Sequence, residues 1–335
     1  MERAQFWYKR PMRTTDFKLR RTVLAWLLDS DPAIRWQVMR DLTDAPPDAI
    51  AAERARVAKE GWGARLLAAQ SSGGNFGDPA EDRGLLITLY SLVVLMDLGL
   101  DPASPQARRM IDRVEKRLVF KLLGNRAFLD GETEPCINGR ILGIGAYFHK
   151  PNAALANQLL REQLEDGGWN CEAVEESPKR PKSRRSSFHT TICVLEGLLA
   201  YERTGRKSAA VTRARKRAER YLVERRMFRS LRTGKVIDER WLRFSYPTFW
   251  HYDVLRGLEY LREAGSKPER RMREAVKVVA ERAHQNARWP MNLLHRERIP
   301  VELESEAGRA SRWNTLRALR VLRWYNGGNA ERRER

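Results

Sequence analysis

One apolar helical segment recurs along the chain and constrains its fold more than any other feature. In its best copy, 186–201, a small residue, Gly197, is followed eight residues later by Gly205. Weaker copies recur at intervals of about fifty to sixty residues, which is the length of a helix-pair repeat. Their small anchor residues are Ser91, Gly143, Gly257 and Ala318. A small anchor lets helices approach closely, and the later glycine can end each helix in a left-handed conformation.

Amphipathic, charged segments separate these copies, at 105–119, 152–164, 208–225 and 267–284. Helices with one charged face cover a layer of helices that are apolar nearly all round. A further step back from Ser91 reaches the helix that contains Met39, which makes six helix pairs. We therefore predict an all-α fold, an α/α toroid of about six helical hairpins with inner and outer rings of helices. An open solenoid of stacked helix pairs is the alternative.

The predicted toroid fills 22–327 as a single domain. Before it, 1–21 is basic and aromatic, and because Pro11 breaks a helix there, we expect an arm. After it, 328–335 is a charged tail that we expect to fray. Asp31 followed by Pro32 is typical of the start of a helix.

Charge and cysteine content narrow the function classes. The chain carries 63 Lys and Arg against 43 Asp and Glu, a net charge of +20, which favours an anionic partner such as nucleic acid. The basic residues are spread along helices, so an arginine-rich surface without a partner is the other interpretation. Three cysteines argue against a disulfide framework and for a reducing cytoplasm. We expect no transmembrane segment, because the longest nearly apolar run, 84–96, is too short, and no secretory signal.

In a toroid the inner helices run in one direction, so residues at their N-termini share one opening. The candidates for catalysis there are Cys136, His189, Tyr246, His251 and Asp253, and the candidates for substrate binding are Asn138, Arg140, Trp250, Arg312, Trp313 and Asn314. Helix N-termini also favour an anionic group. Each candidate has a structural alternative: a buried cysteine, a histidine that hydrogen-bonds a helix, an aspartate that caps one, or aromatic rings that pack the wall.

Turns with glutamine, glycine and an aromatic residue connect outer to inner helices. Two run 67–76 and 160–170, and a degenerate third runs 284–290. We expect the glutamine to bond the turn backbone while the ring packs back on the helix. These turns resemble the QW-type motifs of squalene cyclases and the glycine-aromatic turns of protein prenyltransferase β subunits. The resemblance covers most of 30–325 and implies the toroid.

Two segments resemble the zinc motifs of the prenyltransferase β subunits. Glu134-Pro135-Cys136 is similar to their Asp-x-Cys motif, and 188–198 is similar to their Tyr-His-Thr helix. The resemblance implies that Glu134, Cys136 and His189 bind zinc, with the open fourth position of a catalytic site. The chain departs from the family where glutamate replaces aspartate, and where 128–132 replaces the basic cluster that grips the diphosphate.

These features predict an enzyme of the cyclase or prenyltransferase type, acting in a central cavity on an apolar or isoprenoid-like substrate that carries an anionic group. The nearest match to the acidic motif that protonates olefins, 29–32, ends in proline, so olefin protonation is poorly supported. One alternative is a polysaccharide-lyase-like toroid for acidic glycans, using Tyr246, His189, Asn138 and Arg312. Another is a basic module without catalysis that binds nucleic acid or another polyanion. A prenyltransferase β subunit needs a partner subunit, which the sequence does not identify.

Overall fold

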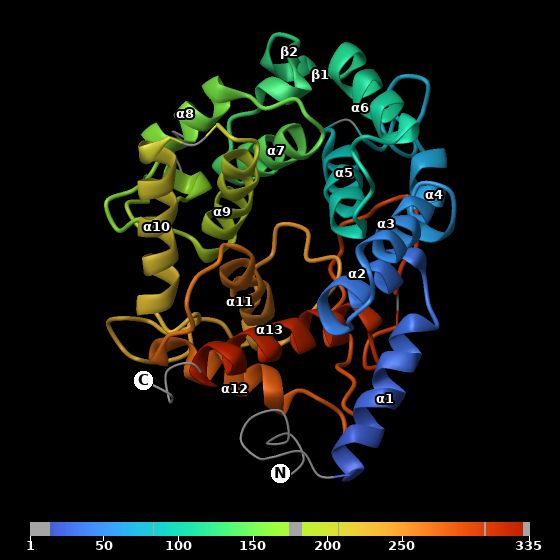
Figure 1. Ribbon diagram of the computed structural model, residues 1–335. Helices are drawn as coiled ribbons and strands as arrows, with labels where there is room; N and C mark the ends of the chain where they lie inside the picture. The colour runs from blue at the N-terminus through green and yellow to red at the C-terminus, as the bar shows by residue number, and fades with distance from the viewer. Residues whose placement is uncertain (1–13, 83, 174–182, 207, 305, 331–335) are drawn as a thin grey trace. The chain divides into compact units, whose positions relative to one another are not determined.

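The computed structural model describes residues 14–82, 84–173, 183–206, 208–304 and 306–330 (Figure 1). The chain is predominantly helical, which confirms the all-α prediction. Among the described residues the named strands are β1 (Val119–Phe120) and β2 (Arg126–Ala127), a short antiparallel pair. None of the helices in the described part of the chain combines the length and apolar character needed to cross a membrane.

The α-helices follow the predicted periodicity. Their bounds are α1 (Thr14–Leu28), α2 (Pro32–Leu42), α3 (Pro47–Arg56), α4 (Gly61–Ala68), α5 (Leu86–Leu98), α6 (Pro105–Arg117), α7 (Pro135–Tyr147), α8 (Ala153–Arg161), α9 (Phe188–Arg203), α10 (Ala209–Glu224), α11 (Val254–Glu263), α12 (Arg273–Glu281) and α13 (Arg312–Ala330). Short 3-10 turns are η2 (Lys121–Leu123), η3 (Phe128–Asp130), η4 (Cys171–Ala173), η5 (Glu239–Leu242) and η6 (Arg270–Met272). Each anchor residue lies in a helix, and the amphipathic segments form α6, α8, α10 and α12.

Local signals explain most helix ends. Asp31 caps α2 by accepting the Ala33 N–H at 2.9 Å, as predicted for an aspartate before a proline. The predicted glycines Gly99, Gly205 and Gly265 all take positive φ angles, of 83°, 85° and 67°. The last helix-pair repeat differs, because α13 continues through Gly327 to Ala330.

The predicted arm and tail need correction where the structure describes them. Residues 1–13 and 331–335 lie outside the described residues. Residues 14–21 are the first half of α1 rather than an arm, since no proline follows Pro11 before that helix ends. Residues 328–330 are likewise helical, as the end of α13.

Contacts divide the chain into two compact units. Unit 1 consists of the described residues of 14–56, 222–296 and 303–330, and unit 2 of 57–221 and 297–302. The closed ring of six hairpins concerns both units together, so it stays a prediction.

In unit 2, α7 and α9 lie side by side (Figure 1). Glycines make this approach possible: a Cβ on Gly139 would lie 2.6 Å from the Cys193 carbonyl oxygen and 2.6 Å from the Val194 Cα. Gly143 of α7 also faces Gly197 of α9, where a Cβ would be 3.5 Å from the Gly197 Cα. The small anchor residues therefore serve close helix packing, as the sequence predicts.

In unit 1, α13 packs against α2, α11 and α12. A buried ion network crosses this core. Glu259 of α11 accepts from Arg317 at 2.6 Å and pairs with Arg320 at 3.3 Å. Arg320 also reaches Asp41 of α2 at 2.5 Å and the Gln37 side-chain oxygen at 2.7 Å. The network joins a helix near the start of the chain to the last helix.

The glutamine turns take the predicted form. Gln163 Nε2 donates to the carbonyls of Gly167 at 2.7 Å and Ala214 at 2.8 Å. The Trp169 indole N–H donates to the Leu159 carbonyl at 2.7 Å, which holds the ring against α8. A threonine in the next helix completes the turn, because Thr191 Oγ1 accepts the Trp169 backbone N–H at 3.0 Å.

The other two turns repeat this pattern in part. Thr88 accepts the Phe76 N–H at 2.9 Å, and Thr315 accepts the Trp289 N–H at 2.9 Å. The threonine was not predicted, and it recurs in both units. In each of these three turns, a hydrogen bond therefore joins the turn to the helix that follows it.

Candidate metal site

The first turn of α7 presents two side chains with metal-binding chemistry. Pro135 at the start of the helix has the φ angle that a first helical residue needs, and Glu134 is the N-cap residue. Asn138 fixes the preceding loop: its Oδ1 accepts the Glu132 N–H at 2.7 Å, and its Nδ2 donates to the Glu132 carbonyl at 3.0 Å. Glu134 and Cys136 are therefore held at a helix N-terminus.

A third side chain, Cys171, reaches this point from the turn before α9. It lies in η4, two residues after Trp169. The Ser187 N–H donates to the Trp169 carbonyl at 2.8 Å, which brings the chain back beside α9. There Cys171 Sγ lies 3.4 Å from the Thr190 hydroxyl.

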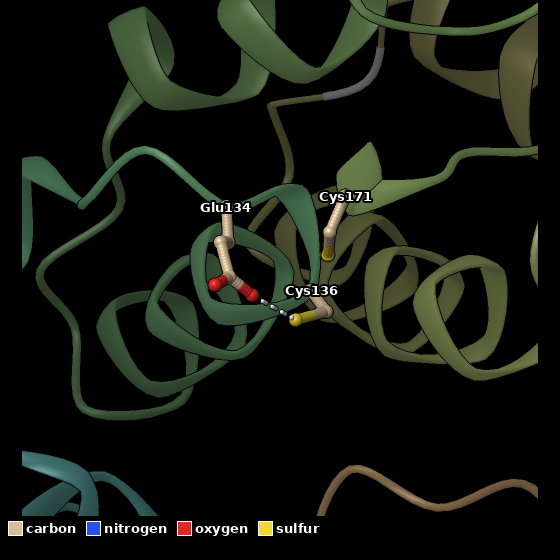
Figure 2. A group of neighbouring side chains, drawn as sticks. All are labelled: Glu134, Cys136 and Cys171. Carbon is tan, nitrogen blue, oxygen red and sulfur yellow. Dashed lines mark hydrogen bonds between the residues drawn. The ribbon is translucent and has the colours of Figure 1, made fainter. Parts of the chain in front are cut away.

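Glu134, Cys136 and Cys171 converge on one point (Figure 2). One ligand atom from each, a carboxylate oxygen and two sulfurs, lies within 4.8 Å of the other two. The Cys136 sulfur lies 3.4 Å from Glu134 Oε2. All three side chains are half-buried, so solvent reaches the group.

The pKa values of the two thiols are shifted in opposite directions. A hydrogen bond from Cys136 lowers the pKa of the Cys171 thiol, against the effect of burial. The same hydrogen bond, together with burial and the neighbouring negative groups, raises the pKa of Cys136. Without a metal ion, Cys171 is therefore the sulfur that ionises first.

These residues fit a zinc ion by chemistry and by spacing. Thiolate and carboxylate are zinc ligands with bonds of about 2.3 Å and 2.0–2.2 Å, so a common ion needs donor atoms a few ångströms apart. The positive end of α7 also favours thiolate at Cys136. Three protein ligands leave one position open, which is the arrangement of catalytic rather than structural zinc.

The structure replaces one predicted ligand. His189 is not among the residues whose ligand atoms converge with those of Glu134 and Cys136; Cys171 holds that place. Successive residues of a helix point about 100° apart. Thr190 of α9 contacts Cys171, and the side chain of the preceding residue, His189, leaves the helix about 100° away from it.

The other predicted residues of unit 2 have different surroundings. Asn138 is fully buried and its side chain holds the loop, as described above. Arg140 is 5% exposed, and its Nε and Nη2 have no hydrogen-bond partner among the described residues. Only Arg140 of this pair has side-chain donors still available to a ligand.

Unit 1 holds a separate group of predicted residues, just before α11. His251 stacks on Trp250 with ring centroids 3.9 Å apart, and on His295 at 3.7 Å with nearly parallel rings. Ser245 Oγ lies 2.7 Å from His295 Nε2. Asp253 is the N-cap of α11 and accepts the Arg256 N–H at 2.7 Å, while its Oδ2 has no hydrogen-bond partner among the described residues.

The remaining predicted residues of unit 1 support its packing. Tyr246 stacks on Trp313 with centroids 4.2 Å apart, and both rings are buried. The Arg312 guanidinium donates to the Asp29 carbonyl at 3.0 Å, and Asn314 Nδ2 donates to the Pro290 carbonyl at 3.0 Å. Predicted site residues thus fall in both units, and the single shared opening stays a prediction.

Sequence reasoning missed Cys171 and His295. Cys171 had a usable signal: it directly follows a glutamine-aromatic turn, and such turns lead to the N-terminal end of the next helix. His295 lies in the loop 292–304, which has no helical periodicity to place it.

Comparison with known proteins assigns no family. The chain matches no protein-family model, and no curated protein matches it significantly. Among solved structures it is similar to "Crystal structure of a protein from Actinoplanes", with a TM-score of 0.45 and 18% identity, over 92% of this chain and 99% of that chain. At this identity and TM-score the similarity says nothing about function.

Proposed function

We propose that the protein is a zinc enzyme whose metal site consists of Glu134, Cys136 and Cys171. The convergence of these three ligand atoms within 4.8 Å is the observation that carries the proposal. Zinc bound there would keep both cysteines as thiolates and offer its open position to a substrate atom. Glu134 supplies the oxygen ligand, and the end of α7 supplies a positive dipole beside Cys136.

We propose a reaction of the cyclase and prenyltransferase class that the sequence resemblance implies, and the mixed oxygen and sulfur ligand set supports this proposal. The resemblance implies a carboxylate, a thiolate and a histidine as ligands. The proposed set keeps Glu134 and Cys136 and has Cys171 in place of His189. The proposed substrate is an apolar or isoprenoid-like molecule with an anionic group, and the proposed architecture is the toroid. We propose a location in the reducing cytoplasm, which the three cysteines of the sequence favour over a disulfide framework.

Metal content tests the proposal directly. Protein purified without chelator is expected to contain one zinc per chain. Cobalt replacing zinc is expected to give a sulfur-to-metal absorption band whose intensity falls by about half in Cys136→Ser and in Cys171→Ser, because each variant lacks one thiolate.

Two variants serve as controls for this measurement. His189→Ala and Cys193→Ser are expected to keep the full band, since neither residue belongs to the converging group. Absence of metal, or an unchanged band in Cys171→Ser, would contradict the proposed site. Loss of the band in His189→Ala would restore the ligand set implied by the sequence resemblance.

A second candidate function, binding of a nucleic-acid backbone, is favoured by a basic cleft in unit 1. The cleft has a volume of about 1190 Å³ and lies between the turn after α10 and the start of α12. Seven cationic side chains line it against three carboxylates: Arg225, Arg226, Arg229, Arg270, Arg271, Arg273 and Lys277, with Glu224, Glu269 and Glu274. Such an excess of exposed positive charge attracts phosphates in a salt-dependent manner.

Binding of a fluorescent DNA duplex tests this candidate. At low salt we expect binding that weakens steeply as salt is added, and that falls at least about tenfold in the double variant Arg270→Glu/Arg271→Glu. The matched control is Arg108→Glu/Arg109→Glu on α6, which reverses two exposed arginines outside the cleft. Absence of binding at low salt, or equal binding by both variants, would rule the candidate out.

A further inference from the structure

Arg140 of α7 is a buried arginine without a complete set of partners. Its side chain is 5% exposed, and Nε and Nη2 make no hydrogen bond to any described residue. Burying a guanidinium is unfavourable unless an opposite charge or acceptors compensate it. Nε and Nη2 of Arg140 therefore remain available to an acceptor that the described residues do not supply.

Other buried arginines of the chain show the contrast. Arg215 of α10, 6% exposed, donates Nε to Glu202 at 2.6 Å and also pairs with Glu219. Arg256, 4% exposed, donates to the His251 carbonyl at 2.6 Å. Where an arginine is buried for structure, this chain gives it an acceptor.

Arg140 lies next to the proposed metal site. It follows Cys136 by four residues in α7, so the two side chains leave the same face of the helix, one turn apart. Both groups act on the hydroxyl of Tyr90 in α5. Burial raises the pKa of that hydroxyl, the charge of Arg140 lowers it, and Cys136 raises it further. The guanidinium and the thiol therefore act on one shared region of unit 2.

The two open donors define the shape of the missing group. Nε–H and one Nη2–H of a guanidinium are parallel and adjacent, and together they bind two oxygens of a carboxylate or a phosphate. The half-buried sulfurs of Cys136 and Cys171 give the region access to solvent. The dipole of α7 adds to the attraction for an anion at that end.

We propose that Arg140 binds the oxyanion group of the substrate, a carboxylate or a phosphate, through Nε and Nη2 at one helical turn from Cys136. That the bound anion belongs to the substrate rests on the proposed function. The oxyanion site itself rests only on the burial, the open donors and the position of Arg140. The ligand class is a small molecule with an oxyanion near the atom that reaches the metal.

Anion binding to the full chain tests this inference, with inorganic phosphate and acetate as probes and chloride at equal ionic strength as reference. Calorimetric titration or the rise in melting temperature is expected to show saturable binding of at least one oxyanion. Arg140→Met is expected to abolish it, and Arg140→Lys to weaken it at least about tenfold, since lysine keeps the charge but not the fork. Arg109→Met, an exposed arginine of α6, is the matched control and should bind as the wild type.

Stability distinguishes a binding arginine from a structural one. Without anion, Arg140→Met is expected to melt no lower than the wild type, because it removes two buried donors that lack hydrogen-bond partners. If Arg140→Met does not fold, oxyanion binding by Arg140→Lys becomes the deciding measurement. Unchanged oxyanion binding in Arg140→Lys, or no oxyanion binding by the wild type, would overturn the inference.

The cobalt band separates this inference from the proposed function. Oxyanion binding that depends on Arg140 in a chain that takes up no cobalt would leave the anion site standing and reject the zinc enzyme. A full cobalt band, together with oxyanion binding that is unchanged in the Arg140 variants, would support the zinc enzyme and reject the anion site. Binding of phosphate but not acetate would assign a phosphorylated substrate, and the opposite preference would assign a carboxylate.

Discussion

Gly197 of α9 faces Gly139 of α7 so closely that a Cβ at Gly197 would overlap the Gly139 carbonyl oxygen. Because that oxygen belongs to the helix backbone, α7 itself has to move to admit a side chain. Gly197→Ala is therefore expected to destabilise unit 2 by about 1–3 kcal/mol, the usual result of overpacking. Urea unfolding followed by far-UV circular dichroism measures the change.

A shift of α7 would also displace Cys136, so cobalt binding should weaken in Gly197→Ala. Gly84→Ala is the matched control, since a Cβ there would meet nothing nearer than the Leu86 side chain at 3.9 Å. Equal stability of the two variants would show that the helices are not in contact as described.

Thiol reactivity should distinguish the three cysteines. The pKa of Cys171 is lowered by the hydrogen bond from Cys136, so its thiolate persists to lower pH than that of an ordinary cysteine. In metal-free protein we expect Cys171 to react first with a thiol reagent, with a rate profile shifted to lower pH. Peptide mapping of the labelled protein identifies the site.

Cys136→Ala removes the donor, so the reaction of Cys171 should then move to higher pH. Zinc should protect Cys171, and Cys193, which is fully buried on α9, should react slowly in either case. Preferential labelling of Cys193 would contradict the described arrangement.

The ion network of unit 1 should make the fold sensitive to acid. Burial alone would raise the pKa of Glu259, but Arg317 and Arg320 outweigh it and hold that pKa below its usual value. A carboxylate whose folded pKa is lowered stabilises the fold above its unfolded pKa of about 4.3, and this contribution is lost as pH falls through the folded value. Stability should therefore decline below about pH 4.

Glu259→Gln tests this network at neutral pH. It leaves two buried arginines with one carboxylate less, so we expect a loss of about 3–5 kcal/mol at pH 7 and a weaker dependence on acid. Denaturant titrations at pH 7 and pH 4 measure both effects. Glu281→Gln, at an exposed residue of α12, should change neither.

The threonine at the end of each aromatic turn should be a point of stability. Thr191→Val keeps the shape of the side chain but leaves the buried Trp169 N–H without its acceptor, which is expected to cost about 1–3 kcal/mol. Thr315→Val should do the same through Trp289 in unit 1. Thermal unfolding measures both, with Thr233→Val at an exposed position as the neutral reference.

Much of the fold was predictable because it depends on local signals. A small residue at Gly143 or Gly197 permits close packing, and glycines such as Gly99 end helices with positive φ. Prediction failed at both ends of the described chain, where helices run past the expected boundaries. Gly327 does not end α13, and 14–21 are helical despite their basic, aromatic composition.

The candidate site was predictable only in part. Glu134 and Cys136 share one helix start, so sequence spacing placed them together. Cys171 joins them through a turn that folds back along α9, which spacing cannot show. Arg140 was predicted to touch substrate from its position alone; its burial and its two open donors became visible only in the structure.

Unit 1 is built from three separate segments of the chain. This construction determines the order in which parts of the chain can fold during translation. Residues 57–221, most of unit 2, emerge as one continuous stretch and can fold early. By contrast, α2 packs against α13 as well as against its neighbours α1 and α3, so its packing can be completed only after α13 has been translated. Until that last helix emerges, the side of α2 that packs against α13 stays uncovered.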